Sequence, residues 1–238
     1  MEKHEDIQYC FQDGNSSCRK VLLSTSIYIT LYIFFSLISA VTVFLNVLVI
    51  ISISHFKQLH TPTNLLILSL AVSDLLVGLI VIPVMTVAIM ESCWGFGEYF
   101  CVFHFFITFL CTTLSLGNLV LISIDRYFAV CDPLLYHSKI TITGKAASVS
   151  GVKTVQANKS ERKATKTLSI VVFTYFICWI PTLLIYFFSS VLGDHLISYF
   201  TSYLPLVNSL INPIIYALFY PWFKVTAKLI LTLKIRRL

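Results

Sequence analysis

The chain has 238 residues, of which 57% are hydrophobic and only 12% charged, and its formal net charge is +6. Soluble domains carry about 25% charged residues, so the composition nearly excludes a soluble enzyme and indicates a protein whose solvent is the lipid bilayer. The seven cysteines have irregular spacing and form no CxxC motif. They therefore predict neither a zinc site nor a compact disulfide scaffold.

Five apolar stretches are long enough to cross the hydrocarbon layer, which takes about 20 residues. They cover roughly Ser26–Ile53, Leu65–Met90, Phe100–Val130, Leu168–Leu192 and Leu196–Phe219. A polar tail (1–25) precedes the membrane part (26–220), and an amphipathic tail (221–238) follows it and should lie along the membrane surface. Since the separator at 193–195 is so short, the last two spans must form an antiparallel hairpin. The predicted fold is an all-α transmembrane helix bundle.

The positions of Lys and Arg predict the orientation. Of these 17 residues, 14 are Lys57 or lie within the stretch 126–166 or the tail from Lys224 onward. The separators at 91–98 and 193–195 contain none. Because Lys and Arg favour the cytoplasmic side, we expect an extracellular N-terminus and a multi-pass protein of the plasma membrane. The long basic loop at about 131–167 would be cytoplasmic.

This orientation places the sequon at Asn15 where it can be glycosylated, while a second sequon at Asn158 stays unmodified. The net charge is explained by topology and attraction to anionic lipids, and no aromatic-interleaved basic patch indicates nucleic acid.

Asp74 is the one acidic residue deep within a predicted span. An intramembrane carboxylate is costly and is by default a functional hypothesis; the alternative is a protonated or hydrogen-bonded residue that packs helices together. Polar residues of three other spans are available to meet it, namely Asn46, Ser115, Asn208 and Asn212. Carboxylate, hydroxyl and amide oxygens together suit a small hard cation.

Two charged clusters lie at the predicted cytoplasmic border. The third span ends with Asp125, Arg126 and Tyr127, and Glu161 precedes the fourth. A pair between Arg126 and Glu161 would hold two helices together until something separates them. The alternative is a cluster of side chains that snorkel to the interface.

Two prolines should bend the last two spans, because each removes a backbone hydrogen bond. Pro181 lies mid-span beside Trp179, and Pro213 lies between Asn212 and Tyr216. Kinks are common in membrane helices, so either proline alone is weak evidence. Their order along the chain, together with the other motifs, is far more specific.

Taken in order, these motifs resemble those of rhodopsin-like G-protein-coupled receptors. The resemblance rests on Asn46, Leu70–Asp74, Asp125–Tyr127, Cys178–Pro181 and Asn212–Tyr216. The string from Asn208 to Tyr216, continued by Tyr220–Phe223, further resembles the last-helix signature of trace amine-associated receptors of the fish olfactory type.

The resemblance implies a small extracellular ligand and a heterotrimeric G protein as partners. Arg126 would engage the G protein when active, and would pair with Asp125 or Glu161 when inactive. Trp179 would be a toggle beneath the ligand, and Tyr216 a switch near the cytoplasmic face. An allosteric sodium ion, the only cofactor expected, would bind at Asp74, Ser115, Asn208 and Asn212.

The resemblance also makes Cys101 the third-helix half of a disulfide to the second extracellular loop, but this chain lacks that loop. Cys10, Cys18 or Cys93 could replace the partner, and the sequence does not choose among them.

The family has seven spans, whereas this chain has five. After the stretch 132–136, which resembles the second cytoplasmic loop, the chain continues directly into 144–162, which resembles the third. The fourth and fifth helices are missing, about 80–100 residues with their loop. We therefore expect this chain to signal poorly and to be retained in part in the endoplasmic reticulum. The alternative role is a non-signalling protein that associates with intact receptors in an oligomer.

The ligand chemistry departs from the pattern as well. Aminergic receptors carry an aspartate 18 residues before the arginine of Asp-Arg-Tyr, where this chain has Thr108, and often a tyrosine where it has Leu206. A hydroxyl offers no counter-charge to an ammonium group. Amine sensing is therefore implied by the family alone. A small channel or transporter is a remote alternative, because it would predict inverted repeats or several intramembrane charges.

Overall fold

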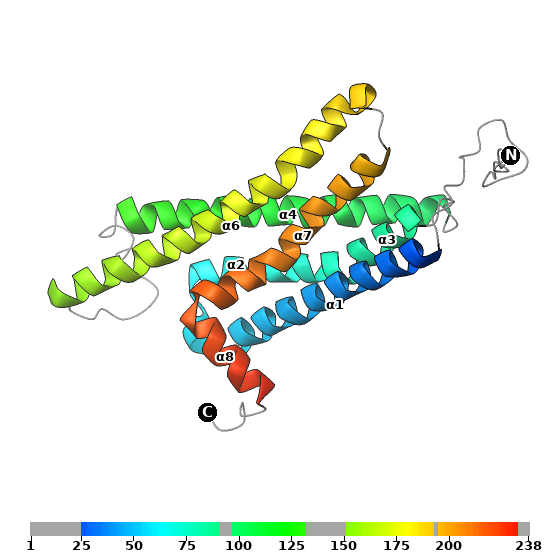
Figure 1. Ribbon diagram of the computed structural model, residues 1–238. Coiled ribbons are helices and arrows are strands. Elements are labelled where there is room, and N and C mark those ends of the chain that lie inside the picture. The colour runs from blue at the N-terminus through cyan, green and yellow to red at the C-terminus, as the bar shows by residue number, and fades with distance from the viewer. Residues whose placement is uncertain (1–24, 91–96, 132–150, 193–194, 233–238) are drawn as a thin grey trace, which may run out of the picture.

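The computed structural model describes residues 25–90, 97–131, 151–192 and 195–232 (Figure 1). Within these ranges the side chains of Arg126 and of residues 151–165 and 195–200, among others, lie outside the description. The helices are α1 (Thr25–His55), α2 (Pro62–Leu76), α3 (Ile82–Met90), α4 (Glu98–Cys131), α6 (Gly151–Leu192), α7 (His195–Phe219) and α8 (Pro221–Leu231). Short turns η1 (Lys57–Leu59) and η2 (Val77–Val81) join α1 to α2 and α2 to α3.

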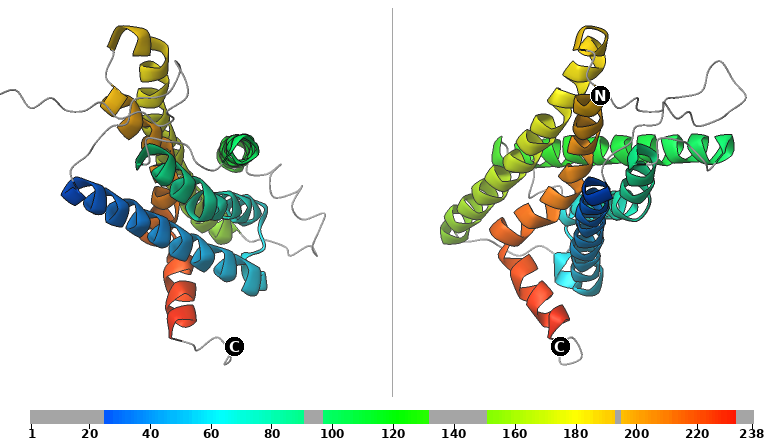
Figure 2. Two further views of the ribbon diagram at one scale, coloured as in Figure 1. Left: turned by 90° about the vertical axis from the view of Figure 1, so that its right-hand side faces the viewer. Right: turned by 45° about the vertical axis from the view of Figure 1, so that its right-hand side comes forward.

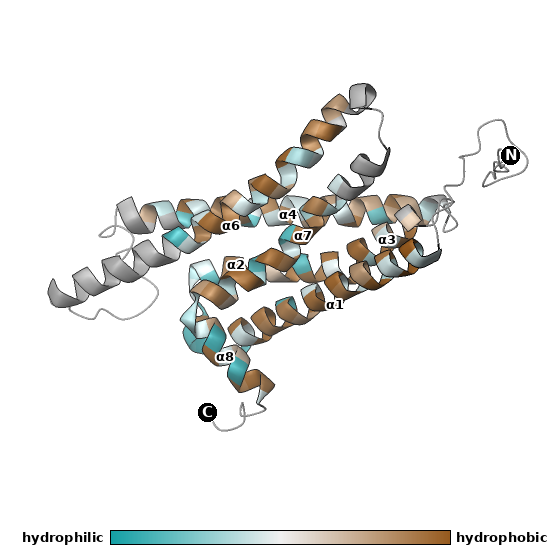
Figure 3. Ribbon diagram, in the orientation of Figure 1, coloured by the Kyte–Doolittle hydropathy of each residue, from teal (hydrophilic) through white to brown (hydrophobic). Residues whose placement is uncertain are grey.

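The described part is a bundle of long apolar helices, as predicted (Figure 3). Four segments are long and apolar enough to cross a membrane, namely Thr25–His55, Pro62–Ala88, Tyr99–Asp125 and Lys166–Ile185. In α7 the segment Tyr203–Phe219 passes the same test only together with α8, from which it is bent by 101°. Figure 1 shows α6 and α7 as an antiparallel hairpin, so the tight connection predicted at 193–195 is confirmed.

The predicted loop at about 131–167 is shorter in the structure, because α6 is already helical from Gly151. No proline occurs between residues 151 and 167, and Lys, Ala, Glu, Arg and Gln in this stretch favour a helix. Hydropathy detects the part of a helix that lies in lipid, so it placed the start of this element too late.

The second span is not one regular helix. The turn η2 is a π-helix, in which the Ile82 N–H donates to the Val77 carbonyl five residues earlier. In this register Pro83 stands where the Gly78 carbonyl would find its donor, but proline has no N–H. The Ser39 hydroxyl of α1 donates to that carbonyl instead, at 2.7 Å. The carbonyl that Pro83 leaves without a donor thus forms an interhelical hydrogen bond between α1 and η2. We call such an interhelical side-chain hydrogen bond a tie.

The prolines of α7 are used in the same way. Pro213 cannot donate to the Ser209 carbonyl, and the Asn46 amide of α1 takes that carbonyl at 3.1 Å. Pro205 cannot donate to the Thr201 carbonyl, which accepts from the Thr182 hydroxyl of α6 at 2.7 Å. Lipid offers no hydrogen bond to a carbonyl that has lost its donor. At each proline, the freed carbonyl therefore accepts from a side chain of a neighbouring helix, which favours one position of that helix.

Two apolar clusters form the core. The cluster nearer α8 contains Val49, Ile53, Ile67, Leu70 and Tyr216. The other contains Phe35, Val81, Ile82, Tyr203 and Leu206. Helices α1, α2 and α7 supply most of the first cluster, and η2, α3 and α7 supply most of the second. Helix α4 packs against α2 and α6 at the side (Figure 2).

Candidate functional site

Asp74 is the centre of a buried polar cluster between α2 and α7. Its side chain is only 1% exposed, and Oδ2 accepts a hydrogen bond from Asn212 Nδ2 at 2.8 Å. The two residues are 138 positions apart in the chain. The structure therefore brings together two of the four residues predicted for the sodium site, with a direct hydrogen bond.

The cluster is rich in oxygen atoms that lack donors. Buried oxygens without a hydrogen-bond partner among the described residues include Asn46 Oδ1, Asp74 Oδ1, Asn208 Oδ1, Asn212 Oδ1 and the Tyr216 hydroxyl. A buried polar atom without a partner is costly, so these oxygens are available to a water molecule or a cation.

The donor set fits a small hard cation. Asn208 and Asn212 lie one turn apart on α7 and thus share a face, and Asp74 supplies the one carboxylate. The fourth predicted residue, Ser115 of α4, is also buried. All the predicted ligands are oxygen atoms, which suit Na⁺ better than a transition metal.

The motif Asp125–Tyr127 and its predicted partner Glu161 are only partly described by the structure. Asp125 Oδ2 accepts a hydrogen bond from the Thr63 hydroxyl at 2.7 Å, and Tyr127 is exposed. The side chains of Arg126 and Glu161 lie outside the described residues, so the predicted pair between them is not tested.

Sequence reasoning missed Thr63 as the partner of Asp125. Thr63 lies in the first turn of α2, which begins with Thr61 as the N-cap and Pro62 as the first helical residue. The side-chain amide of Asn64 donates to the Leu59 carbonyl at 2.9 Å and further fixes this turn. The Thr-Pro-Thr-Asn string is the signal that could have been used, because Ser, Thr, Asp or Asn followed by Pro marks a helix N-terminus.

The predicted toggle lies on α6. Trp179 is half-buried and stacks on Tyr175, with ring centroids 5.7 Å apart and planes at 29°. Pro181 lies inside α6, which continues as a helix to Leu192. Trp179 packs against the cluster that contains Tyr216, so the two predicted switch residues share a core.

The structure divides the predicted ligand-pocket residues: Trp179 packs against the cluster of Tyr216, whereas Thr108 and Leu206 lie in the other half of the bundle. The Thr108 hydroxyl donates to the His104 carbonyl of its own helix at 2.8 Å, and Leu206 is buried in the cluster of Phe35 and Tyr203. The carboxylates whose side chains the structure describes are Asp74 and Asp125, and neither lies in this half of the bundle.

The structure adds residues to this half that the sequence did not single out. Phe35 of α1 stacks on Tyr203 of α7, with centroids 3.9 Å apart and planes at 15°. The Tyr203 hydroxyl donates to Thr86 Oγ1 of α3 at 3.3 Å. His104 is buried, and its Nε2 has no partner among the described residues. The useful signal was helical spacing, since His104 and Tyr203 lie one turn before Thr108 and Leu206.

Some predicted residues remain untested. Cys101 is half-buried and carries a free thiol, while its suggested partners Cys10, Cys18 and Cys93 lie outside the described residues. The sequon at Asn15 lies outside them as well.

The comparisons with known proteins agree with these motifs. The profile of the 7 transmembrane receptor (rhodopsin family) matches residues 45–152 and 139–216. The chain is 33% identical to zebrafish (Danio rerio) trace amine-associated receptor 13c, over 98% of this chain and 95% of the relative. It is also 33% identical to human trace amine-associated receptor 6, over 95% and 92% of the two chains. Mouse trace amine-associated receptor 3 is 44% identical over 58% of this chain and 40% of its own length.

The alignments also bear on the length of the chain. The zebrafish alignment runs over 328 positions, so at least 90 of them lie opposite no residue of this 238-residue chain. The two matches to the family profile meet at residues 139–152, where the sequence predicts the missing helix pair. The family is one of membrane receptors, not of enzymes. The chain therefore belongs to the rhodopsin family of seven-transmembrane receptors and, within it, to the trace amine-associated receptors.

Proposed function

We propose that the gene encoding this chain serves to sense a small extracellular ligand and to activate a heterotrimeric G protein on the cytoplasmic side. The observation that carries the proposal is the buried contact between Asp74 and Asn212. It lies in a region of partnerless oxygens that connects the predicted ligand half of the bundle with the predicted G-protein half. A pair that only joined two helices would normally be surrounded by hydrogen-bonded polar groups, because buried polar atoms are rarely left without partners.

In the proposed mechanism Arg126 contacts the G protein, while Asp125 and Glu161 restrain it in the inactive state. The hydrogen bond from Thr63 to Asp125 holds the Asp125 carboxylate near the start of α2. Ligand-driven movement at Trp179 would shift α6 near Pro181, where the missing backbone N–H weakens the helix. The same movement would rearrange Asn212, Pro213 and Tyr216 on α7.

A sodium ion at Asp74, Ser115, Asn208 and Asn212 would neutralise the buried carboxylate and favour the inactive packing. These residues fit the ion, because Asp74, Asn208 and Asn212 each have a buried oxygen without a hydrogen-bond partner among the described residues.

For the ligand we propose a small molecule bound near Thr108, Trp179 and Leu206. The names of the relatives suggest an amine. Yet the Thr108 hydroxyl, which already donates within α4, supplies no negative charge. An ammonium group in this half of the bundle would need a carboxylate from elsewhere.

We further propose that the chain as it stands signals poorly, because it lacks the fourth and fifth helices. Residues 132–150 between α4 and α6 are too few for two spans of about 20 residues each. The fifth helix would form one wall of both the ligand pocket and the G-protein cavity.

A chimera tests the signalling proposal. The fourth and fifth spans of the zebrafish relative are inserted between Ile142 and Lys145, and cAMP is measured with a panel of small primary amines and neutral analogues. We expect a ligand-dependent response from the chimera that Arg126→Ala abolishes, and none from the 238-residue chain. A response from the unmodified chain would contradict the poor-signalling proposal. A chimera that reaches the surface and responds to no probe would contradict the ligand proposal.

A second candidate role is supported by the exposed aromatic surface of α4 and α6. Phe105, Phe109 and Phe173 are 66–71% exposed, which leaves a large face open to another set of helices. We propose as the alternative that the chain associates with intact receptors and alters their trafficking. Co-expression with a full-length relative should then lower its surface level. An unchanged surface level and response would rule this role out.

The N-terminus is proposed to face the extracellular side of the plasma membrane. Asn15→Gln should remove a glycan and increase gel mobility, whereas the matched change Asn158→Gln should leave mobility unchanged. Surface biotinylation, compared with endoglycosidase-sensitive material, would measure the fraction retained in the endoplasmic reticulum. A shift with Asn158→Gln alone would reverse the predicted orientation.

A further inference from the structure

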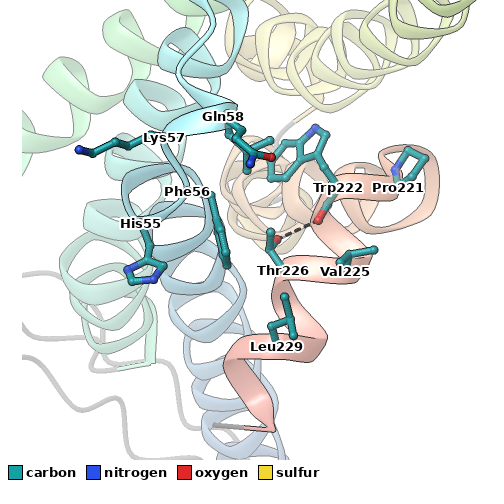
Figure 4. Close-up of a pocket in the computed structure, with 10 residues that line it drawn as sticks. His55, Phe56, Lys57, Gln58, Pro221, Trp222, Val225, Thr226 and Leu229 are labelled. Atoms are coloured by element: carbon teal, nitrogen blue, oxygen red, sulfur yellow. Dashed lines mark hydrogen bonds between the residues drawn. The ribbon is translucent and has the colours of Figure 1, made fainter. Parts of the chain in front are cut away.

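A groove opens at the predicted cytoplasmic border, between the end of α1 and α8 (Figure 4). Its volume is about 590 Å³. One wall comes from the turn after α1, with Phe56, Gln58 and Leu59, and the other from α8, with Trp222, Val225 and Leu229. None of the motifs or proposed roles described above uses this groove.

The groove is held open by fixed contacts. The Thr226 hydroxyl of α8 donates to Ser52 Oγ of α1 at 2.9 Å, and Phe223 is buried in the core. These contacts join α8 to α1 along one side of the groove. The Thr226 hydroxyl also bonds to the Trp222 carbonyl of its own helix at 2.9 Å (Figure 4).

The groove lies at the depth of lipid headgroups. Since α8 turns from the spanning part of α7 by 101°, α8 runs along the membrane surface when α7 crosses it. An amphipathic surface helix lies at the boundary between headgroups and acyl chains. One end of the groove therefore meets acyl chains, and the other meets phosphate groups.

The charges around the groove are one-sided. Lys57 is part of its lining, and none of its described lining residues carries a carboxylate. Figure 4 shows the Lys57 side chain directed outward, away from α8, so its ammonium group lies outside the groove. The interior, in contrast, is formed mainly by aromatic and aliphatic side chains. An apolar interior with a cationic rim matches a molecule that has an acyl chain and a negative headgroup.

We propose that this groove binds one anionic phospholipid, with an acyl chain along Trp222, Val225 and Leu229 and the phosphate near Lys57. The indole of Trp222 suits this boundary, because its ring is apolar and its N–H is polar. This site rests on the membrane location of the chain alone. It requires neither the proposed ligand nor the proposed G protein.

The test measures which lipid the purified full chain retains. The chain is exchanged into detergent with equal amounts of phosphatidylserine and phosphatidylcholine, and bound lipid is counted by native mass spectrometry. We expect one phosphatidylserine to be retained preferentially. Lys57→Gln should lower its retention about fivefold, as expected for one lysine at a membrane surface, and Val225→Trp should lower it by filling the groove.

Lys224→Gln is the matched control, because Lys224 is an exposed lysine of α8 outside the groove lining. Its retention of phosphatidylserine should equal that of the parent chain. Equal losses with Lys57→Gln and Lys224→Gln would overturn the proposal in favour of diffuse surface attraction. Full retention by a helical Val225→Trp variant, or equal retention of the two lipids by the parent chain, would also overturn it.

Discussion

The two sides of the bundle differ in how their helices are held. On one side, α1, α2, η2 and α7 are joined by side-chain hydrogen bonds from Ser39, Asn46 and Asn212, each to a buried or proline-freed group. On the other side, α4 and α6 present aromatic rings outward, and Phe105 and Phe109 are about 70% exposed. Both sides are thus built from apolar residues, but only on the first side do side-chain hydrogen bonds determine which helices pack together. We call this first side the specified side.

The difference shows what specifies packing in a membrane protein. Apolar contact between helices gains little over contact with lipid, since the lipid tails are equally apolar. Polar ties and close-packed small residues therefore set which helices meet. Among the described residues, the face of α4 and α6 carries exposed apolar rings and few hydrogen bonds to other helices.

Gly78→Leu should give the largest loss of stability. A Cβ at this position would lie 3.0 Å from Val43 Cγ2 and 3.3 Å from the Val43 backbone nitrogen. An isobutyl group would force α1 away from η2 and break the bond from Ser39. Overpacking costs about 1–3 kcal/mol and occasionally more, and we expect the upper end. Thermal unfolding in detergent, followed with a thiol-reactive dye at the buried Cys111 and Cys178, measures it.

Gly117 of α4 is the matched control, because a Cβ there meets nothing within 4 Å. Gly117→Leu should leave the unfolding temperature unchanged or raise it slightly, since leucine favours a helix more than glycine does. Equal losses at the two glycines would remove the proposed difference between the two sides.

Phe35→Ala should have the next largest effect. Its ring is 5% exposed and stacks on Tyr203, so its removal leaves a cavity between α1 and α7. Phe→Ala in water-soluble cores costs about 3–5 kcal/mol. We expect about 2–3 kcal/mol, because the transfer from water does not contribute here. Phe109→Ala, at a 71% exposed ring, should cost far less in the same unfolding assay.

The helices and the Asp74 cluster could largely be predicted from the sequence, whereas their ties could not. Hydropathy finds a span because lipid requires apolar side chains along its whole length. The contact of Asp74 with Asn212 could be anticipated because a buried carboxylate must find a donor. The hydrogen bond from Ser39 to the Gly78 carbonyl in the π-turn Val77–Val81 could not be predicted. It depends on how α1 packs against Gly78, which the sequence does not show.

Asn46→Leu should cost about 1–2 kcal/mol. The change removes the amide that donates to the Thr42 and Ser209 carbonyls, and it leaves the Ser209 carbonyl without a donor because of Pro213. Thr182→Val removes the equivalent tie to the Thr201 carbonyl at a half-buried site. We expect it to cost less, about 0.5 kcal/mol. A larger loss with Thr182→Val would mean that α6 is held as firmly as α1.

Thr63→Val, with an expected effect below that of Asn46→Leu, tests the hydrogen bond that joins the start of α2 to α4. Valine has the shape of threonine but cannot donate to Asp125, so we expect a loss of about 0.6–1 kcal/mol. Thr30→Val is the control, because the exposed Thr30 hydroxyl bonds only within its own helix, to the Ser26 carbonyl.

A double-mutant cycle then decides whether the effect passes through Asp125. If Thr63 acts by holding that carboxylate, Thr63→Val should cost almost nothing in an Asp125→Leu background. An unchanged cost in that background would show that Thr63 stabilises α2 by itself. In that case α4 would be joined to α2, on the specified side, mainly by the bond from Asn118 Nδ2 to Ser69 Oγ at 3.0 Å, about two helical turns further into the bundle.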